Sequence, residues 1–484
     1  MEYQVTLLPE KVNISVSQGT DLLTALRSAG VFPDAPCGGA GKCGKCRVTV
    51  DGREVLACRT PVDRDMTVVL PQNTGAAILT GGLETSVRPE PVRPGYLVAF
   101  DIGTTTVAGY LLDGKTGGEL AAVSAMNPQT AWGADVISRI QAALKGAMEE
   151  LTDVIRACLG ELTEELCRRG RIGPEEIGVV SIVGNPAMQQ LFLGLSPENL
   201  AKIPFAPVLT RAEVTEVAAC LPCLSNAGLL VVPDISGFVG ADTVACVLAT
   251  GLDRREEMTL LVDIGTNGEM VMGNRHRMVA CSTAAGPALE GANIRFGMRG
   301  MAGAIDHVTL KDGKIVCSVI GGTEPQGICG SGLIDTVAAA LELGLINSRG
   351  RIQNESRRIP LTEQVFLTQE DIREIQLAKG AIAAGIRLMA KELGITMGDI
   401  DRVYLAGAFG SYLDPESACR MGLLPPELAG KITAVGNAAG AGAKMLALSR
   451  RELQRAEELV RRIEFLELAA LEDFQGAFAR CMRF

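Results

Sequence analysis

Alternating apolar and polar positions dominate the first seventy residues of the chain. Such runs are typical of half-buried strands, whereas residues 20–28 repeat their apolar positions at helical spacing. The Asp51-Gly52 pair between two of the runs is a typical hairpin turn. The pattern predicts a small β-rich domain over residues 1–75, with strands at 3–8, 11–16, 46–50, 53–56 and 66–70.

The next segment loses this periodicity. From Gln72 to Gly95 the chain is irregular and ends in the proline-spaced stretch VRPEPVRPG, and prolines favour extended backbone. We therefore assign residues 76–95 to a linker. Beyond it, strand patterns alternate with long helical patterns, which is typical of α/β folds. The sequence thus predicts a multi-domain protein of α/β and α+β class.

One short motif occurs twice in this second part. Asp-Ile-Gly-Thr is found at Asp101–Thr104 and again at Asp263–Thr266. Each copy lies between two apolar strand patterns, so each is expected to form the turn of a β-hairpin. The repeat predicts a duplicated domain, with its halves at residues 96–258 and 259–484 and with two equivalent hairpins facing one cleft.

Two later segments are expected to complete this cleft. A helical pattern at residues 368–393 opens with a capping-box-like Thr368 and Asp371, and we expect its apolar positions, Leu377 among them, to be buried beside the cleft. A buried-strand pattern runs directly into Ala406–Gly410. We interpret these small residues as a turn that lets the backbone approach an adenosine closely.

The repeated hairpins have the groups that a bound phosphate requires, namely backbone amides, hydroxyls and acids that hold hydrated magnesium. One such hairpin alone is usually an ordinary turn, but two copies in matching contexts reverse that interpretation. We expect Asp101 and Asp263 to anchor Mg²⁺ or orient the attacking water, with Thr104 beside them. The expected nucleotide-binding residues are Gly103, Thr105, Thr106, Gly265, Thr266, Asn267, Gly268, Gly407, Ala408, Phe409 and Gly410.

Four of the 14 cysteines crowd into one short region. Cys37, Cys43, Cys46 and Cys58 have the spacing C-x5-C-x2-C-x11-C on a glycine-rich loop that can wrap closely around a metal cluster. Structural zinc is the alternative, but zinc sites usually pair two C-x2-C units, and only one is present here. The pattern favours an iron-sulfur cluster in a reducing compartment.

Charge and composition narrow the class of partner. The formal net charge is -10 and there is no basic tract, which argues against nucleic acid. No run approaches the roughly 18 apolar residues of a membrane span, and the first thirty residues have no apolar signal core. We expect a cytosolic protein that contacts no membrane. The two histidines, His276 and His307, are expected at the surface.

These motifs resemble known families. Residues 1–75 are similar to β-grasp, plant-type 2Fe-2S ferredoxin domains. The chain from Leu97 onward resembles the actin-like, ribonuclease H-like ATPases of the acetate and sugar kinase, heat-shock chaperone and actin superfamily. With LAC at Leu56–Cys58 and LAGAFGSYLD at Leu405–Asp414, the combination resembles the reductive activators of corrinoid proteins.

The resemblance implies an ATP-hydrolysing enzyme with a 2Fe-2S cluster, ATP and Mg²⁺ as cofactors. One electron would pass from a low-potential donor, such as a ferredoxin, to the inactive cobalt(II) of a corrinoid protein, and would restore cobalt(I) for methyl transfer. The family also implies a homodimer. Larger members insert a further domain between the two parts, whereas this sequence has only the linker there.

Two other functions fit the same motifs. A metabolite kinase with an appended redox domain would need an acid as base, for which Asp135, Asp234 and Asp242 are available. A redox sensor would use the nucleotide only as a conformational signal. The activators of hydroxyacyl-CoA dehydratases share the ATPase, but they are expected to hold a 4Fe-4S cluster between subunits. Further glycine-rich segments either line the cleft or only turn between packed elements, at 181–185, 285–291, 327–332 and 436–442.

Overall fold

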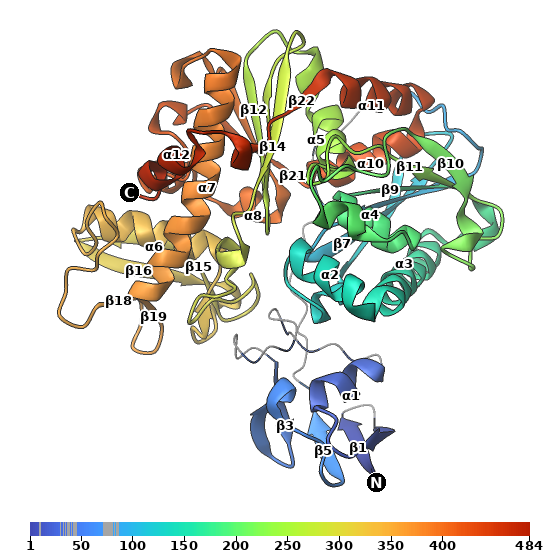
Figure 1. The fold of residues 1–484 in the computed structure, drawn as a ribbon, viewed down its shortest axis with the longest axis horizontal. Coiled ribbons are helices and arrows are strands. Elements are labelled where there is room, and N and C mark those ends of the chain that lie inside the picture. Colours follow the sequence, from blue (N-terminus) through green and yellow to red (C-terminus); the bar gives the residue numbers. More distant parts are fainter. Residues whose placement is uncertain are drawn as a thin grey trace.

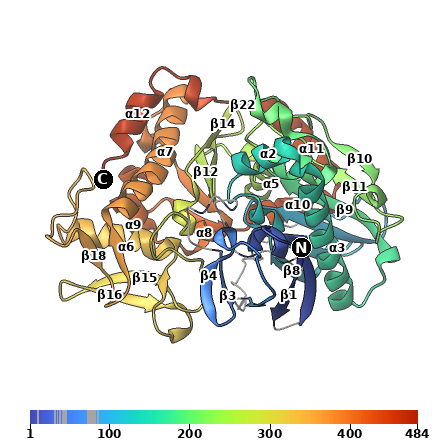
Figure 2. The ribbon, with the colours of Figure 1, turned by 60° about the horizontal axis from the view of Figure 1, so that its bottom comes forward.

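The chain forms one small domain and two larger lobes in the computed structural model. The small domain, blue in Figure 1, lies below the two lobes, and the turned view of Figure 2 brings it to the front. The described residues are 1–8, 11–29, 31, 33, 35, 39, 41, 46–70, 81, 83 and 87–484. The predicted linker therefore lies partly outside the described residues. Within these ranges, no helix combines the length and apolar character needed to cross a bilayer.

The small domain is a five-stranded sheet with one helix packed against it. The strand order is β2-β1-β5-β3-β4, and β1 and β5 are the parallel pair at its centre. Asp21 caps the helix, because its side chain accepts a 3.0 Å hydrogen bond from the Thr24 amide. This is the predicted β-grasp arrangement. The elements are β1 (Glu2–Leu8), β2 (Val12–Ser17), α1 (Leu22–Ser28), β3 (Arg47–Val50), β4 (Arg53–Leu56) and β5 (Met66–Val69).

The first lobe is built on a six-stranded sheet of order β10-β11-β9-β6-β7-β8. Strands β6, β7 and β8 form an antiparallel meander, and β9 lies parallel to β6. Every residue of β9 is buried, as expected for a strand covered on both faces. The strands are β6 (Tyr96–Ile102), β7 (Thr106–Asp113), β8 (Glu119–Met126), β9 (Ile177–Gly184), β10 (Glu213–Glu216) and β11 (Gly228–Val231), and the helices are α2 (Val136–Ala142), α3 (Met148–Gly170), α4 (Pro186–Leu193) and α5 (Ala241–Thr250).

The second lobe repeats this plan, which supports the predicted duplication. Its sheet order is β21-β20-β12-β13-β14-β22, again with an antiparallel meander and a parallel strand beside the first strand. A three-stranded sheet of order β16-β15-β17 and a two-stranded sheet of β18 and β19 extend this lobe. The main strands are β12 (Thr259–Ile264), β13 (Gly268–Gly273), β14 (Met278–Thr283), β20 (Arg402–Ala406), β21 (Ile432–Gly436) and β22 (Ile463–Phe465). The added strands are β15 (Ala304–Lys311), β16 (Lys314–Val319), β17 (Gly327–Ile328), β18 (Arg358–Pro360) and β19 (Phe366–Thr368). The helices are α6 (Gly330–Glu342), α7 (Gln369–Leu393), α8 (Gly407–Tyr412), α9 (Pro415–Arg420), α10 (Ala438–Leu448), α11 (Arg450–Arg462) and α12 (Phe474–Cys481).

Helix α10 connects the two lobes. It follows β21 of the second sheet but packs on β6 and β9 of the first sheet and against α5. The two helices approach closely at Gly442, where a Cβ would stand 2.1 Å from the carbonyl oxygen of Ala245. One apolar cluster accordingly contains residues from both lobes, such as Ala99 and Val271. The predicted second half, residues 259–484, thus supplies a helix that covers the sheet of the predicted first half, residues 96–258.

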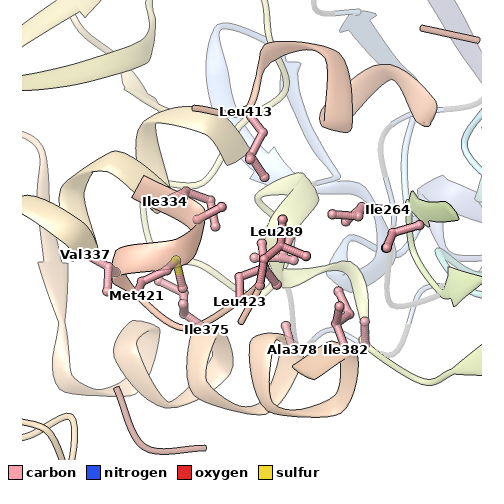
Figure 3. Packing of buried hydrophobic residues seen from close by; sticks show 14 of the residues in the cluster. Ile264, Leu289, Ile334, Val337, Ile375, Ala378, Ile382, Leu413, Met421 and Leu423 are labelled. Carbon is pink, nitrogen blue, oxygen red and sulfur yellow. The ribbon is translucent and has the colours of Figure 1, made fainter. Parts of the chain in front are cut away.

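Helix α7 is the long helix that the sequence pattern predicts, and Thr368 and Asp371 form its capping box. Figure 3 shows Ile375 and Ile382 of this helix pointing into the core beside Leu289. The expectation for Leu377 was wrong, because this side chain is 45% exposed on the opposite face. The helix lies behind the second hairpin and contacts β13 and β14.

Candidate functional site

Both Asp-Ile-Gly-Thr motifs form hairpin turns, between β6 and β7 and between β12 and β13. The first turn requires glycine, because a Cβ on Gly103 would lie 2.7 Å from the Thr106 carbonyl oxygen. Asn127 holds this turn from behind. Its side-chain amide donates to the Gly103 carbonyl at 2.8 Å, and its backbone amide donates to the Thr105 carbonyl at 2.9 Å.

The two turns meet across a narrow cleft of about 140 Å³. The hydroxyl oxygens of Thr105 and Thr266 lie 3.4 Å apart, one from each lobe. The carboxylate of Glu290 lies between them and accepts hydrogen bonds from Thr105 at 3.1 Å and from Thr266 at 2.9 Å. A single carboxylate therefore bridges a hydroxyl from each of the duplicated hairpins, although the repeat position equivalent to Thr266 is Thr104.

Four further acids line the same cleft, and their pKa values are displaced upward. Burial raises the pKa of Asp101 to about 7 and that of Asp263 to about 6, and neighbouring carboxylates add to both effects. Burial also raises the pKa of Asp242 to about 7, and that of Glu269 rises well above its usual value. So much confined negative charge favours a cation.

The residues present fit Mg²⁺ held through water and phosphate. No three His, Cys, Asp or Glu side chains in the described part of the chain converge tightly enough to enclose a metal ion. Mg²⁺ usually keeps several waters and is bound by one or two carboxylates together with substrate phosphates. Asp101 and Asp263, from equivalent strands on opposite sides of the cleft, are placed for that kind of binding.

Two asparagines from the glycine-rich segments at 181–185 and 436–442 also face the cleft, so these two segments line it. Asn185 donates to the Thr104 hydroxyl at 3.0 Å, and Asn437 donates to the Asp101 carboxylate at 2.9 Å. Each follows a parallel strand and caps the next helix, since its side-chain oxygen accepts from the Met188 or the Gly440 amide. The Val-Gly-Asn triplet repeated at 183–185 and 435–437 is the signal that could have shown that these two glycine-rich segments line the cleft.

The segment interpreted as a small-residue turn has a different structure. Strand β20 ends at Ala406, and helix α8 begins directly at Gly407, so the prediction of a turn was wrong. Gly407 itself has a φ of 85°, and a Cβ there would lie 2.6 Å from the Asp263 carboxylate. The close approach expected of this glycine is therefore made to an acid of the cleft.

Most of the predicted nucleotide-site residues lie together. Gly268 instead packs behind the turn, where a Cβ would meet the Thr283 hydroxyl at 2.7 Å. Ala408 and Gly410 belong to α8, and Gly410 does not line the cleft. The predicted residues that do line it are Asp101, Gly103, Thr104, Thr105, Thr106, Asp263, Gly265, Thr266, Asn267, Gly407 and Phe409.

Of the three acids weighed as a kinase base, only Asp242 lines the cleft. Asp135 caps α2 through the Ser138 amide, and buried Asp234 accepts from the Ala241 amide. Neither histidine lines the cleft. His276 is exposed, and His307 lies 3.0 Å from the Asp335 carboxylate.

The cysteine site lies in the small domain. The sulfur atoms of Cys46 and Cys58 are 3.3 Å apart, close enough for two ligands of one cluster. Gly39 of the loop has a φ of 96°, and a Cβ on it would stand 3.9 Å from Cys58 Cβ. Gly39 therefore lies beside the fourth cysteine. Cys37 and Cys43 lie outside the described residues.

Comparison with known proteins assigns each part of this architecture. Residues 5–67 match the 2Fe-2S iron-sulfur cluster binding domain, residues 96–255 the RACo middle region, and residues 257–484 the C-terminal domain of RACo, the ASKHA domain. ASKHA denotes the acetate and sugar kinase, heat-shock chaperone and actin superfamily. The fold and the matches together define an iron-sulfur ATPase with 2Fe-2S and ATP as its cofactors.

The protein belongs to the family of reductive activators of corrinoid proteins. It is 38% identical over 409 residues to the corrinoid activation enzyme RamQ of Eubacterium limosum, covering 78% of this chain and 69% of that one. It is 30% identical over 426 residues to the [Co(II) methylated amine-specific corrinoid protein] reductase of Methanosarcina barkeri, covering 79% and 76%. A solved reductive activator for a corrinoid, iron-sulfur protein superposes with a TM-score of 0.75 at 28% identity, covering 100% of this chain and 98% of that one.

Proposed function

We propose that the protein uses ATP to pass one electron from its 2Fe-2S domain to the cobalt(II) corrinoid of a partner protein, regenerating cobalt(I). The observation that carries the proposal is the union of two sites in one chain. A thiolate site and a two-lobed phosphate cleft occur together in a chain whose relatives are corrinoid activators.

The cysteines would supply the redox site. A 2Fe-2S cluster, when bound, accepts and releases one electron at a time. Cys46 and Cys58 would be two of its ligands, and Cys37 and Cys43 would complete the four. Arg59 would steady the loop, since its guanidinium donates to the Gly41 carbonyl at 2.6 Å.

The cleft residues would bind Mg-ATP. Asp101 and Asp263 would hold hydrated Mg²⁺ or orient the attacking water, and Thr104, Thr105 and Thr266 would donate to phosphate oxygens. The remaining predicted residues, Gly103, Thr106, Gly265, Asn267, Gly268 and Gly407–Gly410, would shape the turns and the adenosine side.

ATP can drive an uphill transfer only if it binds two states of the protein with different affinity. The cleft offers such a difference. At about 140 Å³ it is smaller than the roughly 300–1,000 Å³ of small-molecule sites, so the lobes must part to admit a nucleotide. The hydroxyls of Thr105 and Thr266 would then donate to phosphate oxygens in place of Glu290.

We infer a low-potential donor such as a ferredoxin, and a homodimer formed through the ATPase part, on the strength of family membership. Light scattering on the purified protein tests the second point, and a mass equal to one chain would contradict it.

An anaerobic assay tests the function directly. The reduced protein is mixed with a cobalt(II) corrinoid protein, and the cobalt(I) absorption is followed with and without Mg-ATP. Cobalt(I) should appear only with ATP and should be lost in Asp263→Ala, while the cluster spectrum persists. Absence of cobalt(I) with several corrinoid proteins, despite an intact cluster and ATP turnover, would favour the kinase or the sensor.

A further inference from the structure

Five arginines converge on one hollow of about 620 Å³ in the second lobe, and none of them lines the nucleotide cleft. All five are exposed. They are Arg349, Arg351, Arg357, Arg373 and Arg483. Because the whole chain carries a formal net charge of -10, this concentration of positive charge is local. Its lining residues come from α7, from α12 and the residues after it, and from the segment that precedes β18; Figure 1 labels these three elements.

The backbone under these arginines is fixed by two glutamines of α7. Gln369 accepts from the Ile352 amide at 3.0 Å and donates to the Gly350 carbonyl at 2.7 Å. Gln376 donates to the Arg349 carbonyl at 3.3 Å and to the Met482 carbonyl at 2.8 Å. These hydrogen bonds join α7 to residues 349–352 and to Met482, so the backbone that carries the arginines is held in place.

Among the described residues, none of the five guanidinium groups has a carboxylate within ion-pair distance. The acid whose pKa reflects one of them is Glu370, just outside the hollow. Its pKa is lowered first by hydrogen bonds from its own backbone amide and from Thr368, and only then by Arg373 and Arg295. Within the described ranges, the positive charge of the hollow is therefore not neutralised by any ion pair.

We propose that this hollow binds a small anion carrying two or more phosphate groups. Guanidinium groups pair with phosphate through two parallel hydrogen bonds, so five of them can serve several phosphates at once. The volume lies within the range of small-molecule sites, and a concave site encloses a compact anion better than it receives a flat protein surface. Leu377 and Met482 add apolar wall for an organic group.

Calorimetric titration of the full-length, cluster-loaded protein with sodium triphosphate tests the proposal. Divalent cations are removed beforehand on a chelating resin, so that none offsets the carboxylates of the nucleotide cleft and no soluble chelator competes for the hollow. The test variant is Arg351→Gln with Arg373→Gln, since neither guanidinium makes a hydrogen bond among the described residues. The control is Arg171→Gln with Arg461→Gln, which removes the same charge from two exposed positions elsewhere.

We expect one triphosphate per chain, with affinity that falls as salt rises. The test variant should bind at least about 30-fold more weakly, because two charge-assisted contacts are lost, and the control should match the wild type. Equal affinity in both variants overturns the proposal. Absence of triphosphate binding also overturns it, and if the test variant then weakens the complex with a corrinoid protein, the hollow receives an acidic protein surface.

Discussion

The guanidinium carbon of Arg27 lies 5.6 Å from the centre of the Trp132 ring, so that a residue of the ferredoxin domain contacts the first ATPase lobe. Arg27 also donates to the carbonyl of Ala131. Ala131 and Trp132 lie at the end of the short 3-10 turn that begins after Asn127. Asn127 in turn holds the first phosphate turn through the Gly103 carbonyl. A shift of that turn would therefore be felt at the contact between the domains.

Arg27→Ala should weaken the response of electron transfer to ATP. Loss of one cation–π contact and one hydrogen bond is expected to slow ATP-dependent cobalt(I) formation about tenfold. The cluster spectrum and ATP affinity should be unchanged. Arg53→Ala, at an exposed position of the same domain, is the control. Equal rates for the two variants would show that this contact does not carry the signal.

Cys58→Ala should abolish the visible absorption and the electron paramagnetic resonance of the cluster. Nucleotide binding should persist, because the thiolates and the cleft lie in separately packed domains. Cys223→Ala removes an exposed thiol in the first lobe and should leave both properties intact. Parallel measurement of the spectrum and of ATP affinity decides the matter, and simultaneous loss of both would contradict independence of the domains.

The stability of the protein should depend on pH because of the buried acids of the cleft. Asp101 and Asp242 have pKa values of about 7 in the folded protein, against an ordinary 3.8. A raised folded-state pKa contributes stability that is present below the unfolded value and is lost as pH rises through the folded value. Between pH 5 and 8, the Tm in EDTA should therefore fall.

Asp101→Asn should flatten this fall by roughly 5–10 °C in scanning calorimetry, since the two pH units below a folded pKa of about 7 correspond to about 2–3 kcal/mol, and about 1 kcal/mol shifts the Tm of a large domain by about 2–4 °C. Mg-ATP should also restore the Tm of the wild type at pH 8, because the cation offsets the ionised carboxylates. A variant with the same slope as the wild type would show that Asp101 does not titrate in this range.

Glu290→Gln should tighten Mg-ATP binding. The substitution removes a negative charge from the cleft and weakens the carboxylate bridge between Thr105 and Thr266 that phosphate must replace. We expect the Kd to fall about tenfold, in line with the loss of charge-assisted hydrogen bonds. Glu324→Gln, at an exposed site, is the control. Weaker binding would instead make Glu290 a ligand of the bound nucleotide complex.

Local signals predicted much of this molecule. The hairpins at Asp101 and Asp263 follow from short strands and a glycine turn, and the start of α7 follows from its capping box at Thr368. These features are decided within a few residues, so the sequence contains them directly. The position of Leu377 was missed because helical periodicity alone does not fix which edge of the apolar face is covered.

The sequence left open whether the glycine-rich segments at 285–291 and 436–442 line the cleft, because that depends on distant contacts. Glu290 reaches the cleft from a short turn after β14, and Asn437 lies 336 residues beyond its partner Asp101. Such residues become part of the site only when the lobes are assembled. Helix α8 begins at Gly407, where a turn was predicted. Glycine at this position permits a tight change of direction, but it also permits the close approach to Asp263, so glycine alone does not distinguish the two.

The position of α10 has a consequence for biosynthesis. The face of β6 and β9 that it covers leaves the ribosome long before Ala438–Leu448 is synthesised. Until then, the nascent first lobe has an uncovered apolar sheet, and such surfaces are where chaperones bind and aggregation begins. Completion of this lobe is thus a late event in translation, set by a helix encoded near the other end of the message.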